Sequence, residues 1–194
     1  MPRIAAATIA EQREWRRQQL IDAAAAIALE SGGAAITVAA VAQRAGLART
    51  SVYEYFASSD ELVADLVVSE LRSFAQTLSD AVRDVSDSEE IIRKWVVAAL
   101  TYIADGRHLL AKALNSVTTS SARSHEIGAA HRNLLSPLHG ALSEMGIEDK
   151  SYALSMVQSL TDASAKRIEA GANAEEEIAR TSSFCVAGLR SLIA

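Results

Sequence analysis

The sequence predicts an all-α protein, and three observations carry this prediction. Prolines number only 2 and glycines 9 among the 194 residues, while alanine is abundant, which favours long helices over a turn-rich β-sandwich. Apolar residues recur at three-to-four spacing along most of the chain, which is the period of an amphipathic helix. No stretch alternates apolar and polar residues with the period of a strand, and no internal repeat is present.

The composition is that of a globular chain. Apolar residues make up 49% and charged residues 22%, which argues against intrinsic disorder. The single cysteine, Cys185, excludes a disulfide framework and a cysteine-based zinc site. The longest nearly apolar run, residues 95–104, is shorter than the roughly 20 residues of a membrane-spanning helix. The first residues lack the apolar segment of an export signal. We therefore expect a cytoplasmic protein without membrane association.

Three helices are predicted in the first third of the chain. They cover residues 11–31, 37–45 and 48–55. Thr37 is suited to cap the second helix, and Gly46 follows that helix at the position where glycine commonly ends one. Val52 and Phe56 are spaced to face inward from the third helix. Short helices joined by a tight glycine turn describe a helix-turn-helix.

Longer helices are predicted over the rest of the chain. Ser58-Ser59-Asp60-Glu61 and Asp87-Ser88-Glu89-Glu90 read as helix starts, and Pro137 suits a first helical turn. The expected helices cover residues 59–82, 87–105, 108–116, 121–135, 137–145, 151–169 and 174–192.

Residues 37–62 carry the features that point to function. Thr37 opens the second helix, Ala45-Gly46-Leu47 forms the turn, Val52-Tyr53 and Tyr55-Phe56 belong to the third helix, and Asp60-Glu61-Leu62 opens the fourth. This segment resembles the DNA-binding domain of TetR-family transcriptional regulators. The specific resemblance covers about residues 11–62, roughly a quarter of the chain, and the remainder is similar in length and all-helical layout.

The resemblance implies two domains and a mode of action. Residues 1–57 would form a three-helix helix-turn-helix domain that binds DNA, and residues 58–194 a larger helical domain for effector binding and dimerisation. The implied function is a dimeric transcriptional regulator, in this family most often a repressor, that a small-molecule effector releases from a palindromic operator. The helix over residues 59–82 would act as the lever between the two domains.

The third helix carries the residue types that read double-stranded DNA. Arg49, Thr50 and Ser51 lie at its N-terminal end, from which a recognition helix contacts base edges, and we expect Arg49 to read a base. Hydroxyl groups and helix N-termini contact phosphate oxygens. The candidate DNA-binding residues are therefore Thr37, Arg44, Arg49, Thr50, Ser51, Tyr53 and Tyr55.

Alternative roles stay open for some of these residues. Tyr53 and Tyr55 suit aromatic positions in or around a small core, and Arg44 suits a solvated surface. A possible DNA arm is formed by Arg13, Arg16 and Arg17. Glu11 and Glu14 are interleaved with these arginines, so a salt-bridged helix face is an equal alternative.

Two positions depart from the family pattern. Ser59 stands where the family commonly has a lysine that contacts phosphate, and Ala48 stands where a capping residue is frequent, at a cost of about 1 kcal/mol to the helix start. Residues 37–58 hold only two arginines against Glu54. A monomer is therefore expected to bind DNA weakly, and a dimer is expected to double the contacts.

The larger domain offers candidates for an effector pocket and for a dimer interface. Aromatic and polar side chains on its middle helices suit a pocket with apolar walls and a few polar groups. The pocket candidates are Phe74, Trp95, Tyr102, His108, Asn115, His131, Leu134 and Gln158. Apolar and small residues form stripes on the last two helices, through which the family dimerises. The interface candidates are Val157, Leu160, Ser164, Ile178, Ser182, Cys185 and Leu189.

An enzyme is not expected, because the usual catalytic arrangements are missing. The histidines are His108, His125, His131 and His139. They form no His-Glu-x-x-His motif, and neither a glycine-rich phosphate loop nor a serine nucleophile elbow occurs. We therefore expect no cofactor and no metal site.

The charge distribution keeps one other function class open. The chain has a formal net charge of −5, and residues 1–60 carry six arginines against six acidic residues. A DNA-binding domain usually has a basic surface. The alternative is a helical protein-interaction module without specific DNA binding.

Overall fold

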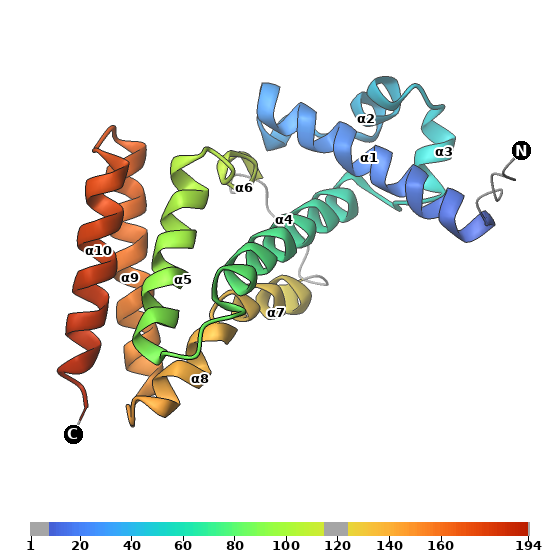
Figure 1. Cartoon of the computed structure of the whole chain (residues 1–194). Coiled ribbons are helices and arrows are strands. Elements are labelled where there is room, and N and C mark those ends of the chain that lie inside the picture. The colour runs from blue at the N-terminus through green and yellow to red at the C-terminus, as the bar shows by residue number, and fades with distance from the viewer. Residues whose placement is uncertain (1–7, 115–123, 194) are drawn as a thin grey trace, which may run out of the picture. The chain divides into compact units, whose positions relative to one another are not determined.

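The structure is a computed structural model that describes residues 8–114 and 124–193. Within these ranges the chain is all-α and contains no strand, which confirms the predicted fold class (Figure 1). The helices are α1 (Ile9–Ser31), the 3-10 turn η1 (Gly33–Ala35), α2 (Val38–Ala45), α3 (Arg49–Tyr53), α4 (Ser59–Val82), α5 (Ser88–Ala104), α6 (Leu109–Leu114), α7 (Ser124–Leu134), α8 (Ser136–Glu144), α9 (Lys150–Glu169) and α10 (Ala174–Arg190).

The chain divides into two compact units. The first contains the residues up to Ser69 together with Leu110–His125, and the second contains Glu70–Leu109 and the residues from Glu126 onwards. Helix α4 therefore supplies its first half to one unit and its second half to the other. These units are defined by contacts within the chain. The predicted boundary at residue 57, between a DNA-binding domain and an effector-binding domain, stays a prediction.

The ends of the first helices follow from their capping residues. The Thr37 hydroxyl accepts a hydrogen bond from the Ala40 amide at 3.1 Å, and Gly46 adopts the left-handed conformation with φ 67°, as predicted for both ends of α2. Ala48 precedes α3 without a side-chain cap. Thr8 and Glu11 form a reciprocal capping box at the start of α1, which therefore begins at Ile9, before the expected start at residue 11.

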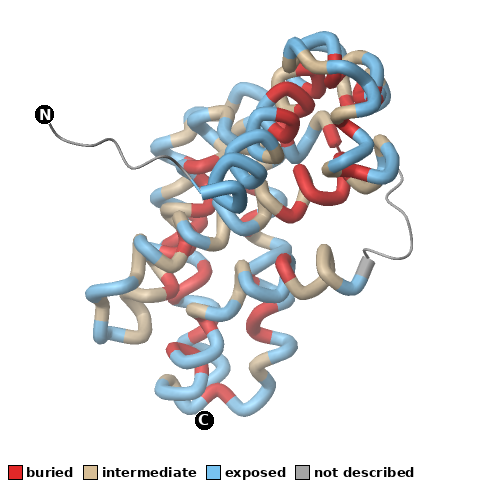
Figure 2. Tube along the Cα trace, turned by 90° about the vertical axis from the view of Figure 1, so that its right-hand side faces the viewer, coloured by how far each residue is buried: buried red, intermediate tan, exposed pale blue. Residues whose placement is uncertain are grey.

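The core of the first unit is built from the apolar stripes of its short helices. Val52 and Phe56 are buried as predicted, with 0% and 1% of their surface exposed. Helix α6 adds Leu110 and Leu114 to the same core. In Figure 2 the buried stretches of these helices alternate with exposed ones, as helices with one inward face require. The other large members of this core are Leu20, Ile21, Ile27, Ile36, Val38, Val41, Leu62, Val63 and Leu66.

The second unit has its own core around α5, which packs against α8, α9 and α10. Ile92, Trp95, Ala99 and Tyr102 are buried on one face of α5, and the Trp95 indole N–H donates to the Leu134 carbonyl oxygen at 2.9 Å. Pro137 lies in the first turn of α8, as expected. The predicted C-terminal end of the helix over residues 108–116 and the start of the one over residues 121–135 lie outside the described residues.

Candidate nucleic-acid interface

Helix α3 presents polar side chains to solvent at its N-terminal end and packs its apolar side against the core of the first unit. Arg49 and Thr50 are exposed, and Ser51 is half-buried. Val52 and Phe56 lie in the core of the first unit. Arg49 and Thr50 are therefore accessible to a ligand. Val52 and Phe56, which are buried in the core, fix the orientation of the helix. This arrangement is suited to inserting hydrogen-bond donors into a DNA groove.

The two tyrosines differ in their surroundings. Tyr53 is 52% exposed. Tyr55 follows the end of α3, is half-buried, and has the Arg13 guanidinium carbon 5.9 Å from its ring centroid. Arg13 also donates to the Glu54 carbonyl oxygen at 3.4 Å. The N-terminal half of α1 thus lies beside the end of α3, and a surface hollow of about 330 Å³ there is lined by Ile9, Gln12, Arg13, Arg16, Glu54 and Tyr55.

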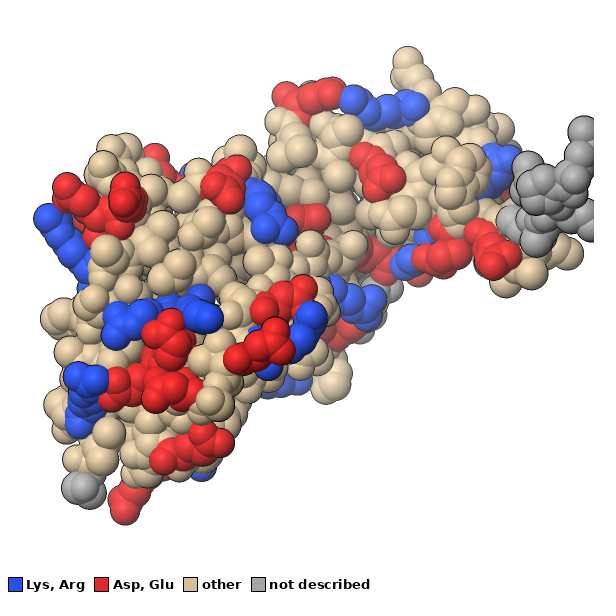
Figure 3. Space-filling model, in the orientation of Figure 1, with Lys and Arg blue, Asp and Glu red and all other residues tan. Residues whose placement is uncertain are grey.

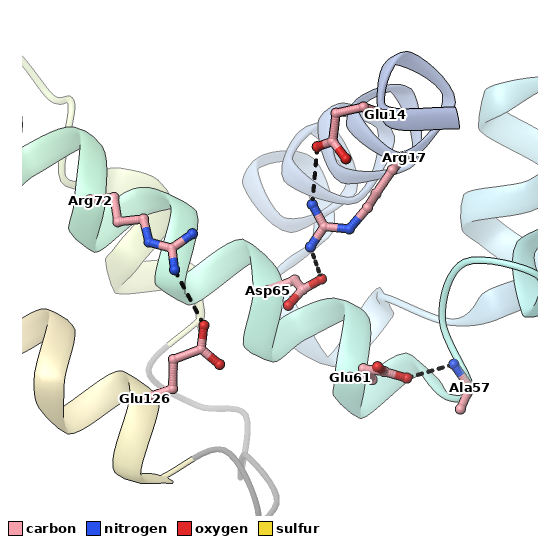
Figure 4. Close-up of polar contacts among 7 residues, drawn as sticks. All are labelled: Glu14, Arg17, Ala57, Glu61, Asp65, Arg72 and Glu126. Carbon is pink, nitrogen blue, oxygen red and sulfur yellow. Dashed lines mark hydrogen bonds and ion pairs between the residues drawn. The ribbon is translucent and has the colours of Figure 1, made fainter. Parts of the chain in front are cut away.

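Arg17 points into the first unit, unlike the other arginines of α1. It forms an ion pair with Asp65 of α4 and a weaker one with Glu14 at 3.4 Å (Figure 4). Its guanidinium carbon also lies 5.6 Å from the centroid of the Phe56 ring. Of the three arginines proposed as a DNA arm, Arg17 therefore has an internal role, whereas Arg16 is exposed and has no ion pair within the described residues.

Arg44 is held by a carboxylate. Its two terminal nitrogens donate to the two carboxylate oxygens of Glu30, at 2.6 and 2.5 Å. This bidentate pair lowers the pKa of Glu30 and raises that of Arg44. Arg44 is therefore not an isolated solvated charge, which is the alternative role considered for it. It must also leave Glu30 before it can bind DNA. Glu30 was not among the predicted site residues, because a spacing of 14 residues gives no signal in helical periodicity.

Charged side chains are mixed over the surface. On the face drawn in Figure 3, acidic and basic groups are interspersed, and neither sign forms a continuous area. The long-range electrostatic attraction for DNA is correspondingly modest on this face. On this face, local contacts by individual arginines therefore matter more than a broad basic patch.

The candidate pocket residues do not converge on one cavity. The Phe74 and Tyr102 rings are 4.5 Å apart, Trp95 is buried in the core, and His131 and Gln158 are exposed. His108 has its Nε2 atom 2.7 Å from a carboxylate oxygen of Glu169, and Leu134 is half-buried against the core. Asn115 lies outside the described residues.

A groove of about 620 Å³ runs between α4 and α5, and among the pocket candidates that the structure describes Tyr102 alone lines it. Its walls combine apolar and charged side chains. They are Thr77, Asp80, Ala81, Glu90, Arg93, Lys94, Val97, Ala98, Thr101, Tyr102 and Arg107. This groove offers room for a small molecule beside an apolar wall.

Two cations of this groove are not neutralised by its acidic residues. Asp80 pairs with Arg83, and Glu90 pairs with Arg93. Lys94 is exposed and has no ion pair within the part of the chain that the structure describes.

Arg107 is the second of these cations. Its guanidinium carbon lies 4.2 Å from the centroid of the Tyr102 ring, and it donates to the Thr77 hydroxyl at 3.2 Å. Burial raises the pKa of the nearby Glu70 carboxyl above its ordinary value, and the positive charge of Arg107 offsets a smaller part of this rise. The stacked guanidinium is thus held in place and retains further N–H donors.

The proposed dimer-interface residues pack inside the chain. Val157, Cys185 and Leu189 belong to the core of the second unit, and Leu160 and Ile178 pack against it. The Ser164 and Thr181 hydroxyls are 2.6 Å apart, and Ser182 is buried. The stripes therefore join α9 and α10 to their own unit. Burial also raises the pKa of the Cys185 thiol to about 11, so this cysteine is a small apolar residue at neutral pH.

Three large apolar side chains of α9 and α10 are exposed outside the buried stripes. Tyr152 is 50% exposed, Met156 39% and Phe184 64%. An exposed set of this kind commonly marks a protein contact surface.

The described residues hold neither a metal-binding cluster nor a membrane-spanning helix. They contain no group of three or more histidine, cysteine, aspartate or glutamate side chains placed to hold a metal ion. None of their helices is both long enough and apolar enough to cross a membrane.

Comparison with known sequences places the first unit. Residues 20–66 match the model for bacterial regulatory proteins of the tetR family. The chain is 40% identical over 80 residues to the HTH-type transcriptional repressor KstR2 of Mycobacterium tuberculosis. The match covers 41% of this chain and 38% of that repressor, so less than half of the curated relative is represented.

Comparison with solved structures extends the likeness in fold to nearly the whole chain. The fatty acid degradation regulator FadR of Bacillus halodurans is 21% identical, with a TM-score of 0.71 over 90% of this chain and 96% of that one. FadR of Bacillus subtilis, solved in complex with stearoyl-CoA, is 20% identical, with a TM-score of 0.69 over 91% and 99%. A TetR-like regulator from Rhodococcus sp. RHA1 is 20% identical, with a TM-score of 0.69 over 97% and 98%. These relatives are regulators of transcription and not enzymes.

Proposed function

We propose that this chain is a transcriptional repressor of the TetR family that binds DNA through α3, because residues 20–66 match the model of that family and 80 residues are 40% identical to an HTH-type transcriptional repressor. The observation that carries the proposal is that Arg49 and Thr50 of α3 are exposed, whereas Val52 of the same helix and Phe56, shortly after its end, are buried. In this proposal Arg49 and Thr50 reach base edges in the major groove.

The remaining candidates serve to position the protein on the DNA backbone. The Thr37 hydroxyl lies at the N-terminus of α2, where phosphate oxygens are well accommodated. Tyr53 and Arg16 are exposed on the same unit and can donate to phosphates. Ser51, Tyr55 and Arg13 are expected to support these contacts from the edge of α3.

The repressor is proposed to act as a homodimer on a palindromic operator. One copy offers few cations to DNA, so two copies are needed to bring the contacts to useful affinity. We place the dimer contact on the exposed side of α9 and α10, at Tyr152, Met156 and Phe184, because the stripes predicted from the sequence are already buried within the chain.

The effector is proposed to bind in the groove between α4 and α5. An apolar wall at Val97, Ala98 and Tyr102 and two cations, Lys94 and Arg107, favour a small organic anion with an apolar body. The stearoyl-CoA bound to FadR of Bacillus subtilis is a larger compound with both properties. An effector would release DNA by favouring a dimer whose two recognition helices are wrongly spaced for successive major grooves, about 34 Å apart.

The test is selection of bound duplexes from a pool of random sequences by the purified chain at near-physiological salt. An enriched inverted repeat supports a dimeric, sequence-specific regulator, and its half-site spacing reports the geometry of the dimer. Enrichment of a single half-site would contradict the dimer while keeping the DNA-binding function.

A protein-interaction module is the alternative, and the neutral balance of charge in residues 1–60 favours it. It predicts no enrichment of any duplex even at low salt. Because a co-purified effector would also abolish binding, the selection is repeated after unfolding, removal of bound ligand and refolding. Continued failure would then overturn the proposed function.

A further inference from the structure

Glu30 and Arg44 form a surface pair that links the last turn of α1 to the last turn of α2. Both hydrogen bonds of this pair are short, at 2.5 and 2.6 Å. The two side chains are nevertheless 58% and 39% exposed. A phosphate group in solution can therefore reach the Arg44 guanidinium, but only in competition with a carboxylate that already occupies it.

The position of Glu30 is unfavourable for its own helix. The C-terminal end of a helix carries a partial negative charge, which favours cations and disfavours carboxylates. Helix α1 has no basic residue in its last turn, and Glu30 is located there. Arg44 offsets this cost from the neighbouring helix. The chain thus keeps an acidic residue where helix stability alone would favour a neutral or basic one.

Arg44 also lies close to the proposed DNA-binding surface along the chain. Gly46 turns the backbone directly after α2, and Arg49 begins α3. Among residues 37–58, Arg44 and Arg49 are the two basic residues. Whether Arg44 is free or held therefore changes half of the local positive charge available to DNA.

We propose that Glu30 restrains Arg44 and thereby weakens the sequence-independent attraction of this protein for the DNA phosphate backbone. This inference rests on the proposed function. Binding of Arg44 to a phosphate requires release of the Glu30 carboxylate, which then faces the same phosphates as an unpaired negative charge. Both effects reduce affinity for any duplex, whereas base contacts by Arg49 are unaffected. Glu30 is in this sense a positioning residue that favours discrimination over total affinity.

The experiment measures binding of the full chain to a fluorescent duplex of random sequence over a series of salt concentrations. Glu30→Gln removes the charge and retains the size of the side chain. We expect it to tighten binding about two- to fivefold at low salt, the equivalent of one exposed ion pair. If Arg44 then contacts one phosphate, the slope of log K against log salt becomes steeper by about 0.9.

The matched control is Asp22→Asn. Asp22 is exposed on the same helix and accepts a hydrogen bond from the Gln18 amide at 2.9 Å, with no ion pair to an arginine within the described residues. It tests the effect of one lost negative charge without the release of a cation. We expect a smaller gain in affinity and an unchanged salt slope.

A double-mutant cycle with Arg44→Gln assigns the effect to the pair. In the Arg44→Gln background, Glu30→Gln should change binding no more than Asp22→Asn does. Thermal unfolding of each variant is followed separately, because a purely structural role for the pair alters the unfolding midpoint and leaves the salt slope alone.

The outcomes separate this inference from the proposed function. If the original protein binds the duplex but Glu30→Gln behaves like Asp22→Asn, or acts equally without Arg44, the restraint is overturned and DNA binding stands. If no variant binds any duplex even at low salt, the proposed function and the inference that rests on it both fail.

Discussion

Arg17 of α1 and Asp65 of α4 form an ion pair in the interior of the first unit (Figure 4). The Asp65 side chain is only 8% exposed, whereas that of Arg17 is 35% exposed. The guanidinium carbon of Arg17 also lies 5.6 Å from the centroid of the Phe56 ring, which follows the end of α3. One guanidinium group therefore contacts residues of α4 and of the segment after α3, and so links both to α1. The first half of α4 is thereby fixed to the unit that carries α3, the proposed recognition helix.

Removal of Arg17 is expected to destabilise the protein more than removal of Asp65. Arg17→Ala removes the cation that faces the buried Asp65 carboxylate, which should lower the free energy of unfolding by about 1–3 kcal/mol, a value reduced from that of a fully buried pair because Arg17 is partly solvated. Asp65→Asn should cost less. Urea denaturation measures both, with exposed Arg16→Ala as the control. Equal losses for Arg16→Ala and Arg17→Ala would contradict the role of the pair.

The double substitution Arg49→Ala with Thr50→Ala should abolish sequence-specific DNA binding. Loss of direct base contacts corresponds to about 100-fold weaker binding to the selected duplex, with secondary structure unchanged because both side chains are exposed. Fluorescence anisotropy with selected and scrambled duplexes measures the discrimination. Arg132→Ala, an exposed arginine of α7, serves as control. Retention of full sequence preference by the double variant would show that α3 is not the recognition helix.

Phe184→Asp should convert the proposed dimer into a monomer. Phe184 is 64% exposed in the single chain. Burying a charge in place of an aromatic ring at an interface should raise the dimer dissociation constant by a factor of at least about 10. Analytical ultracentrifugation over a range of concentrations follows the change. Leu29→Asp introduces the same charge at a side chain of α1 that is 56% exposed, and it should leave the dimer intact. A dimer that survives Phe184→Asp would exclude this face.

Octanoate should bind the groove between α4 and α5 more tightly than octanol, which has the same chain without the charge. Arg107→Gln should weaken octanoate binding about tenfold through the loss of charge-assisted hydrogen bonds, and Lys94→Gln about two- to fivefold. Isothermal titration calorimetry measures these constants. Lys166→Gln, on the exposed side of α9, is the control. Equal affinity for octanol and octanoate would remove the argument for an anionic effector.

Acid should weaken the attachment of α9 to α10. A hydrogen bond from Arg167 at 2.7 Å lowers the pKa of Glu177 below its ordinary value of 4.5. A carboxyl with a lowered folded-state pKa adds stability above its unfolded-state pKa and loses that contribution as the pH falls through the folded-state value. Stability should therefore decline below about pH 4.5, and less steeply in Glu177→Gln. Unfolding in urea at several pH values tests this difference.

Helix positions were predictable from the sequence because periodicity and capping are local signals. The start of α4 at Ser59 and that of α10 at Ala174 agree with the predictions. The partners of charged side chains were not predictable in the same way. Arg17 and Asp65 are 48 residues apart, and only the acidic residue within the apolar first half of α4 hints that a cation must approach it.

The last two helices illustrate a second limit. An apolar stripe shows that a helix face is covered but does not identify what covers it. Val157 and Cys185 were expected at a dimer interface, and the structure places them in the core of their own unit. The exposed Phe184 is the better indicator of a protein contact surface, because it is a large apolar side chain that does not belong to the buried stripe of α10.

The buried state of Cys185 has a practical consequence for studying this protein in motion. It is the single cysteine of the chain, and with a pKa of about 11 only roughly one thiol in ten thousand is reactive thiolate at neutral pH. Maleimide dyes and thiol-reactive spin labels should therefore react very slowly with Cys185 in the native protein. A cysteine introduced at any exposed position will carry the probe alone, so spectroscopic distances can be measured without first replacing a core residue.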